Sequence, residues 1–242
     1  FNWRITYLIL SSIIFIFLLP NIILISDSPE KYGLQISNEN QDSDNDKAYK
    51  DIIKDVIYWL IILNNFVFGF FWSGFNINAT DIFYLNANFS KSNTANLIFI
   101  PITIGVLIGS FLIGILIDKI NNKYKLFLFS FCFFMFSLII YLYTIISNSL
   151  TIIVNSFIYG VFIGINVTNT SVLLPCMYGY KDLAKIQSLH NGLILFSTGT
   201  GSLLFSFIKY LYGNYNFIFY LISLLLCFDS LLIFFVTIKK NL

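Results

Sequence analysis

The sequence predicts an all-α membrane protein, a polytopic helical bundle of about seven transmembrane helices. Hydrophobic residues make up 57% of the chain and charged residues only 11%, against roughly 25% charged residues in soluble domains. Mean hydropathy is +0.81. The apolar residues gather in runs of roughly 20 residues, each long enough to cross a hydrocarbon layer about 30 Å thick. These observations exclude a water-soluble globule.

The candidate transmembrane helices are the apolar runs 5–25, 56–76, 97–117, 126–146, 150–173, 188–209 and 215–237. Pro20 predicts a kink or the end of the first helix. The polar stretch after the first run is rich in Asp, Asn and Ser, which predicts a linker. The expected units are 1–25, a transmembrane helix; 26–55, a cytoplasmic linker; 56–238, a six-helix unit; and 239–242, a cytoplasmic tail.

The distribution of positive charge predicts which side of the membrane each loop occupies. If 26–55 is cytoplasmic, only Arg4, Lys91 and Lys209 of the 14 Lys and Arg residues lie on the opposite side. Loops on the cytoplasmic side carry an excess of Lys and Arg. We therefore expect the chain to be an integral, multi-pass membrane protein with 26–55 in the cytoplasm.

Polar residues recur at helical spacing within two of the runs. In 150–173, Tyr159, Asn166, Asn169 and Thr170 share one helix face. Polar groups inside a membrane bundle usually line a substrate path, so this face predicts part of a substrate cavity. The alternative is hydrogen bonding between helices without substrate contact.

A second stripe is predicted in the run 56–76. Asn65 and Trp72, seven residues apart, share one face of this helix, and Asn64 lies beside that face. We assign all three to the cavity. Trp72 is also compatible with an aromatic anchor at the membrane interface.

Two ionisable residues are candidates for proton coupling. Asp229 stands alone within the last run, and a carboxylate inside a membrane is costly and usually functional. His190 is the only histidine, and its ordinary pKa of about 6.5 suits proton transfer. The alternatives are a packed, protonated carboxyl and an interfacial histidine.

Small residues predict where helices approach closely. Gly105 and Gly109 have the spacing that allows two backbones to touch, and residues 197–202 are all Ser, Thr or Gly. The second stretch is more typical of a packing surface than of a ligand site.

Catalytic and cofactor chemistry have little support in the sequence. The three cysteines lack metal or redox spacing, and neither a nucleophile motif nor a phosphate-binding loop is recognisable. The net charge of +2 does not favour nucleic-acid binding. We expect a non-enzyme without cofactor or metal, with the lipid bilayer and a small-molecule substrate as its partners.

A charged turn, Asp118 to Lys125, joins the runs 97–117 and 126–146. Gly114, Asp118, Lys119 and Lys123 are spaced as in the cytoplasmic loop signature Gly-x-x-x-Asp-Arg/Lys-x-Gly-Arg-Arg/Lys. The chain thereby resembles the major facilitator superfamily of transporters. Asn121 and Asn122 replace the second glycine and the first following arginine of the signature. The resemblance implies that this turn is a gating motif.

The resemblance also implies how the chain is organised. Trp3-Arg4 and the acidic linker resemble the start of helix six and the central cytoplasmic loop of these transporters, so the runs correspond to helices 6–12. A preceding N-terminal half of the same chain is the expected partner. The stretch 178–206 resembles the monocarboxylate-transporter-like and nodulin-like branches. Their Asp/Arg pair in helix eight is absent here, where that helix carries no charge.

The function expected from these features is secondary-active transport of a small organic solute, an organic anion or another metabolite, by alternating access. The alternative is a multi-pass membrane protein that does not transport, such as a sensor, a scaffold or a channel subunit. The polar faces within 56–76 and 150–173 discriminate between the two: cysteines placed at Asn65 and Asn166 react with water-soluble thiol reagents if the faces line a transport cavity, and do not react in a scaffold.

Overall fold

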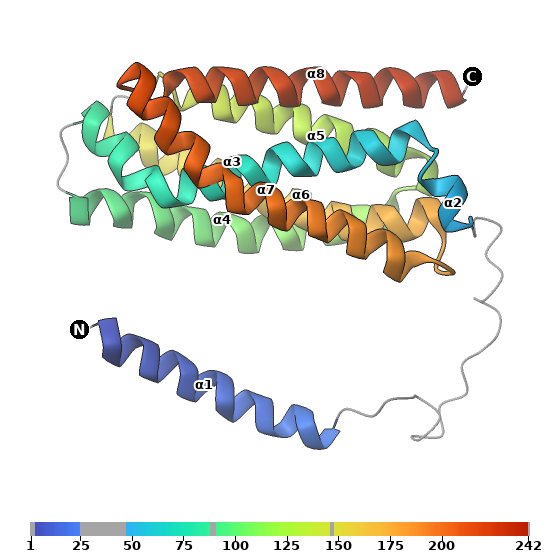
Figure 1. Cartoon of the computed structure of the whole chain (residues 1–242), viewed down its shortest axis with the longest axis horizontal. Helices are drawn as coiled ribbons and strands as arrows, with labels where there is room; N and C mark the ends of the chain where they lie inside the picture. The colour runs from blue at the N-terminus through green and yellow to red at the C-terminus, as the bar shows by residue number, and fades with distance from the viewer. Residues whose placement is uncertain (1–2, 25–46, 88–90, 146–147, 242) are drawn as a thin grey trace. The chain divides into compact units, whose positions relative to one another are not determined.

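The computed structural model describes residues 3–24, 47–87, 91–145 and 148–241 (Figure 1). The chain divides into two units, Phe1–Asp42 and Ser43–Leu242. The first unit contains α1 (Trp3–Leu24), an apolar helix with Pro20 inside it rather than at its end. Most of the predicted linker 26–55, up to residue 46, lies outside the described residues.

The second unit is a bundle of six long helices with one short helix before them. The helices are α2 (Tyr49–Ile52), α3 (Val56–Ala87), α4 (Lys91–Lys119), α5 (Asn122–Leu142), α6 (Ser149–Tyr178), α7 (Leu183–Tyr212) and α8 (Asn216–Asn241). Within the described residues, seven helices are long and apolar enough to cross a membrane and no strand is found. The predicted fold class is confirmed.

Most of the long helices extend beyond the predicted runs. α6 and α7 each have 30 residues, or about 45 Å at about 1.5 Å per residue, which exceeds the hydrocarbon thickness. Their extra turns carry polar residues. A prediction from hydropathy leaves such residues out of an apolar run, but the backbone hydrogen bonds of the helix continue through them. Gly213 ends α7 with φ 72° and ψ −7°, the left-handed conformation in which glycine commonly ends a helix. Gly179 ends α6 with a positive φ of 76° but an extended ψ of −168°, a combination that also favours glycine.

The pairing of the six helices has an internal symmetry. The most extensive contacts are α4 with α6, α3 with α7 and α5 with α8, followed by α5 with α6 and α3 with α8. Exchanging α3 for α6, α4 for α7 and α5 for α8 converts this set of pairs into itself. Since helix direction alternates along the chain, the two groups of three helices cross the bundle in opposite senses. The contacts therefore define an inverted repeat of three plus three helices.

Four glycines let α4 and α6 approach with their backbones in contact. Gly105 and Gly109 on α4 face Gly160 and Gly164 on α6. A methyl group added to Gly109 would overlap the carbonyl oxygen of Val161, and the other three also abut backbone atoms of the facing helix. The close contact predicted from the Gly105 and Gly109 spacing is confirmed, and α6 supplies a second pair at the same spacing.

The contact between α3 and α7 also depends on small residues. Gly69 faces the Ser197 side chain, and Gly201 abuts the backbone of Phe70. Gly199 has no atom within 4 Å of an added Cβ. The stretch 197–202 therefore packs along one of its faces, as the small-residue pattern predicts.

An aromatic cluster fills the centre of the bundle. The ring of Phe71 on α3 lies 6.1 Å from Phe136 of α5, 5.8 Å from Tyr159 of α6 and 5.8 Å from Phe219 of α8, between ring centroids. Three of these four rings are fully buried, and Phe219 is 1% exposed. Aromatic pairs at such separations contribute about 0.5–1.5 kcal/mol each. Four helices thus share one packing centre.

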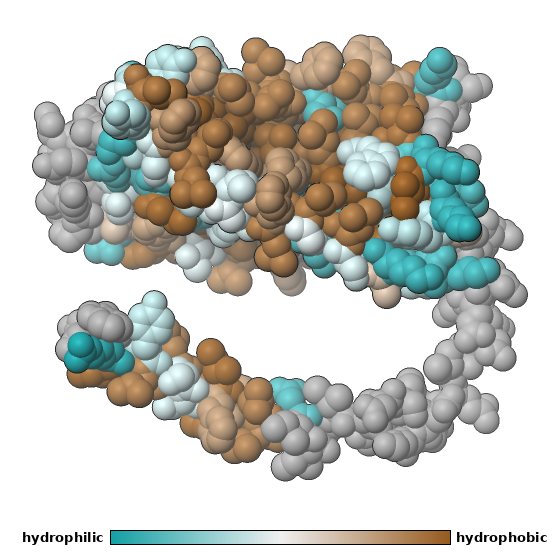
Figure 2. Space-filling view, in the orientation of Figure 1, coloured by the Kyte–Doolittle hydropathy of each residue, from teal (hydrophilic) through white to brown (hydrophobic). Residues whose placement is uncertain are grey.

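The two ends of the bundle differ in their polar contacts. At the end formed by α2, Tyr49 N–H donates to Asp182 Oδ2 at 3.0 Å and Tyr58 O–H donates to the Ile186 carbonyl at 3.1 Å. These bonds fasten α2 to the turn before α7, and the start of α3 to the first turn of α7. Hydrophobic surface covers the middle of the bundle, and hydrophilic groups gather at the α2 end (Figure 2).

At the opposite end, an ion pair joins α3 to α7. Lys209 Nζ contacts Asp81 Oδ2, and each side chain is 35% exposed. Tyr215, just before α8, donates to the same oxygen at 3.0 Å. Burial, followed by the hydrogen bond to Asp81, raises the pKa of the Tyr215 hydroxyl well above its usual range. The α3/α7 pair is thus fastened at both ends.

Candidate functional site

A cavity of about 320 Å³ lies among α3, α6 and α7. We call it the α3/α6/α7 cavity. Its lining residues are Asn65, Phe68, Val167, Thr170, Ser171, Leu174, Gln187, His190, Asn191 and Ile194. Asn65 is nine residues into α3, about 14 Å along the axis, and His190 is seven residues into α7, about 10 Å. The cavity is therefore nearer to the α2 end of the bundle than to the other end.

A hydrogen bond between α6 and α3 forms part of its wall. Thr170 Oγ1 donates to Asn65 Oδ1 at 3.2 Å. Asn65 Nδ2 donates to the Ile61 carbonyl at 2.9 Å, which orients the amide. The two side chains are 7% and 4% exposed. This bond brings together two residues from the separately predicted polar stripes.

His190 contributes the α7 side of the wall. Its side chain is 4% exposed, and its Nε2 has no hydrogen-bond partner among the described residues. A buried imidazole nitrogen without a partner is costly, because water no longer solvates it. The structure thus places His190 in the same cavity as Asn65 and Thr170.

The other predicted cavity asparagines are buried but do not line this cavity. Asn64 is fully buried, and Asn166 and Asn169 are each 1% exposed. Neither side-chain atom of Asn64 or Asn166 has a partner in the part of the chain that the structure describes, and the same holds for Asn169 Nδ2. Within the described residues, these amides are interior polar groups that each keep at least one hydrogen-bonding atom without a partner.

The two predicted aromatic site residues belong to the packed core. Tyr159 lies 5.0 Å from Phe75 and 5.6 Å from Phe136, between ring centroids. Trp72 is half-buried and packs against the same core. Neither lines the α3/α6/α7 cavity.

Asp229 lies within α8, away from the lining of the cavity. It is 3% exposed, and neither carboxyl oxygen has a hydrogen-bond partner among the described residues. It shares the buried face of α8 with Leu226 and Ile233. A carboxyl in such surroundings is costly to ionise.

The charged turn occupies the α2 end of the bundle. Gly114 has no atom within 4 Å of an added Cβ. Asp118 and Lys119 are exposed where α4 ends. Lys123 lies in the first turn of α5, and its side chain is outside the described part of the structure. The turn therefore presents Asp118 and Lys119 to the surroundings of the bundle.

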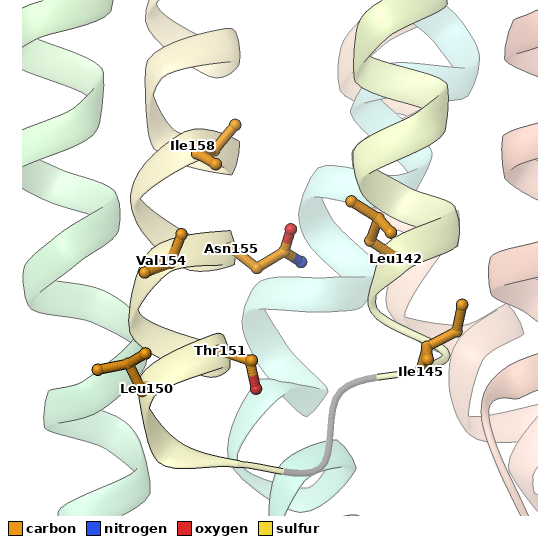
Figure 3. A pocket seen from close by; sticks show the side chains of 7 residues that line it. All are labelled: Leu142, Ile145, Leu150, Thr151, Val154, Asn155 and Ile158. Carbon is orange, nitrogen blue, oxygen red and sulfur yellow. The ribbon is translucent and has the colours of Figure 1, made fainter.

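A second hollow, about 400 Å³, lies between the end of α5 and the start of α6 (Figure 3). Five of its seven lining residues are Leu, Ile or Val. Thr151 Oγ1 already donates to the Asn148 carbonyl at 2.7 Å and accepts from the Asn148 N–H at 3.2 Å, both at the start of α6. Asn155 is the remaining polar residue. This hollow suits hydrocarbon better than a polar solute.

The sequence analysis predicted His190 for proton coupling but missed the other lining residues that α7 contributes to the α3/α6/α7 cavity. Gln187, His190, Asn191 and Ile194 follow one another by three, one and three residues on α7, so they share a face. That stripe is readable, but the predicted run began at 188 and left Gln187 out. Ser171 and Phe68 gave no signal, because only the helix contacts select their faces.

These seven apolar helices, with polar residues gathered between three of them, are typical of a multi-pass helical membrane protein. The chain belongs to the major facilitator superfamily, whose family model, Major Facilitator Superfamily, matches residues 1–175. No curated protein and no solved structure matches the chain. The family consists of transporters rather than enzymes, and the protein is in this general sense a membrane transporter.

Proposed function

We propose that the protein carries out secondary-active transport of a small organic solute by alternating access, with the α3/α6/α7 cavity as part of the substrate path. The bond between Thr170 and Asn65 carries this proposal. It joins two polar stripes across the bundle in a cavity that also contains the unpartnered His190. Convergent polar groups in a well-formed cavity are typical of a ligand site.

The six-helix unit 56–238 is proposed to be the C-terminal half of the transporter, corresponding to helices 7–12. Two observations support this. The helix contacts follow an inverted repeat of three plus three, which is common within each half of these transporters. The Gly114 to Lys123 motif lies between the second and third helices of the unit, where the second copy of the family's loop motif is expected. The other half is then the principal partner.

Asp118, Lys119 and Lys123 are proposed to act as a latch between the halves. Asp118 and Lys119 form no ion pair within the described residues, so their charges remain available to another surface. Asp229 and His190 are the proposed proton-coupling residues, since both are buried with unpartnered atoms.

A place in the monocarboxylate-transporter-like or nodulin-like branch is supported by the likeness of residues 178–206 alone. The family match ends at residue 175 and does not reach this stretch. Transport of an organic anion through this cavity would need positive charge from outside its lining.

Reconstitution of the full chain in liposomes tests the proposal. Solute uptake that saturates, and that falls when Asn65→Leu is introduced, is the expected result. Cysteine at Ser171, an exposed position in the cavity wall, should react with a water-soluble thiol reagent. If the thiol is unreactive and no solute enters, the protein is a scaffold or a sensor.

A further inference from the structure

We propose that the α3/α6/α7 cavity takes an electrically neutral solute with hydroxyl or amide groups on one side and hydrocarbon on the other. This inference rests on the proposed transport function and narrows its substrate class. It depends on three properties of the wall: its charge, its hydrogen-bonding groups and its apolar surface.

The wall carries no permanent charge. None of the ten described lining residues is Lys, Arg, Asp or Glu. The nearest lysine along α7, Lys185, pairs with Asp182 at 2.7 Å and is 67% exposed at the helix end. An ionised solute that enters the cavity would lose its hydration free energy and would find no opposite charge in the wall to compensate for it. This cost is large in a low-dielectric site. A neutral solute avoids this cost.

The wall offers both donors and acceptors of hydrogen bonds. Asn65 Nδ2 donates one proton to the Ile61 carbonyl and retains a second one. Thr170 and Ser171 use their protons on Asn65 Oδ1 and the Thr168 carbonyl, so their oxygens still accept. The imidazole of His190 and the side-chain amides of Gln187 and Asn191 provide further donors and acceptors. Hydroxyl and amide groups, which also donate and accept, match this set.

The rest of the wall is hydrocarbon. Phe68, Val167, Leu174 and Ile194 come from the same three helices as the polar residues. A solute with polar groups all around it would leave some of them facing these side chains without partners. At about 320 Å³, the cavity is near the lower limit of ligand pockets and has room for about ten water-sized groups. The solute is therefore small and has two unlike sides.

Uptake into proteoliposomes from a defined mixture tests this inference. The mixture contains neutral sugars, polyols and small amides, together with carboxylates and ammonium compounds, all at equal concentration. The full chain is reconstituted, and the solutes retained inside are quantified by mass spectrometry against empty liposomes. Asn65→Leu, His190→Leu and His190→Gln are compared with Ser188→Ala. Ser188 is an exposed α7 residue outside the cavity, and its hydroxyl bonds to its own helix.

The expected result is accumulation of one or more neutral solutes at least tenfold above empty liposomes. Asn65→Leu and His190→Leu lower this accumulation at least tenfold, and Ser188→Ala leaves it unchanged. His190→Gln, which can form hydrogen bonds but cannot carry a proton, restores solute entry without its proton coupling. Accumulation of carboxylates or ammonium compounds that the two leucine variants abolish overturns the neutral class and leaves transport standing. Neutral uptake insensitive to both variants overturns the assignment to this cavity. If no solute of any class accumulates, the transport function itself fails.

Discussion

Thr170 on α6 donates a hydrogen bond to Asn65 on α3 across 3.2 Å, although the two residues are 105 positions apart in the chain. Both side chains are buried, so the bond fixes the separation of two helices at the cavity wall. Hydrogen bonds between transmembrane helices contribute about 0.6 kcal/mol on average and up to about 1.7 kcal/mol.

Replacing Thr170 by Val removes this bond while keeping the branched shape. We expect the free energy of unfolding to fall by about 0.5–1.5 kcal/mol, because the Asn65 oxygen loses its partner. Thermal unfolding of the purified protein in detergent measures this effect. Thr103→Val is the matched control, since Thr103 is exposed and bonds only within α4. Equal effects of both substitutions would show that the interhelical bond contributes nothing.

Gly109→Ala tests the backbone contact between α4 and α6. The new methyl group overlaps the Val161 carbonyl, and a rigid helix cannot move aside as a flexible side chain can. We expect a loss of about 1–3 kcal/mol in the free energy of unfolding, typical of overpacking. The measurement is the fraction of purified protein that stays monodisperse as the temperature is raised, compared between Gly109→Ala and the unmodified protein. Gly199→Ala, which meets no atom within 4 Å, should be neutral or slightly stabilising; a loss as large as that of Gly109→Ala would contradict the explanation.

The contact between Tyr49 and Asp182 should depend on pH. The hydrogen bond from Lys185, followed by the bond from Tyr49 N–H, lowers the pKa of Asp182. Because the folded-state pKa is below the ordinary value of about 3.9, the stabilisation is present above that value. It is lost as the pH falls through the lowered pKa. The Tyr49 amide should therefore be protected from hydrogen exchange at pH values above about 4. This protection should be lost at lower pH.

Asp182→Asn is the matched variant for that measurement. An asparagine still accepts the bond from Tyr49 but does not titrate in this range. Protection of the Tyr49 amide should then become independent of pH between about 2 and 6. A pH dependence that persists in Asp182→Asn would assign the effect to another group.

Asp118→Asn tests the proposed latch. The exposed carboxylate at the end of α4 loses its charge but keeps its size, so we expect slower uptake at unchanged expression. Uptake by reconstituted protein, normalised to protein content, is the measurement. Asn121→Ala, an exposed residue of the same turn whose side chain makes no cap hydrogen bond, is the control. If Asp118→Asn takes up solute as fast as the unmodified protein, the proposal that Asp118 is part of a latch is wrong.

The sequence by itself determined the class of protein, the number of helices and the family. The thickness of the hydrocarbon layer fixes the length of an apolar run, so composition and the spacing of these runs predict the class and the number of helices. The spacing of Gly114, Asp118, Lys119 and Lys123 indicates the family. The Gly105 and Gly109 spacing also predicted a close helix contact correctly. Its partner, the pair Gly160 and Gly164, follows the same spacing and was equally readable.

Only the tertiary structure decided which polar residues meet. Asn64 and Asn65 are adjacent in the chain, yet Asn65 lines the cavity and Asn64 does not. Tyr159 shares a helix face with Thr170 but packs among aromatic rings. A helix presents neighbouring residues about 100° apart, and the contacts of α3 with α6 and α7 select the face that encloses a cavity. That selection depends on packing between distant segments, which the spacing within one helix does not contain.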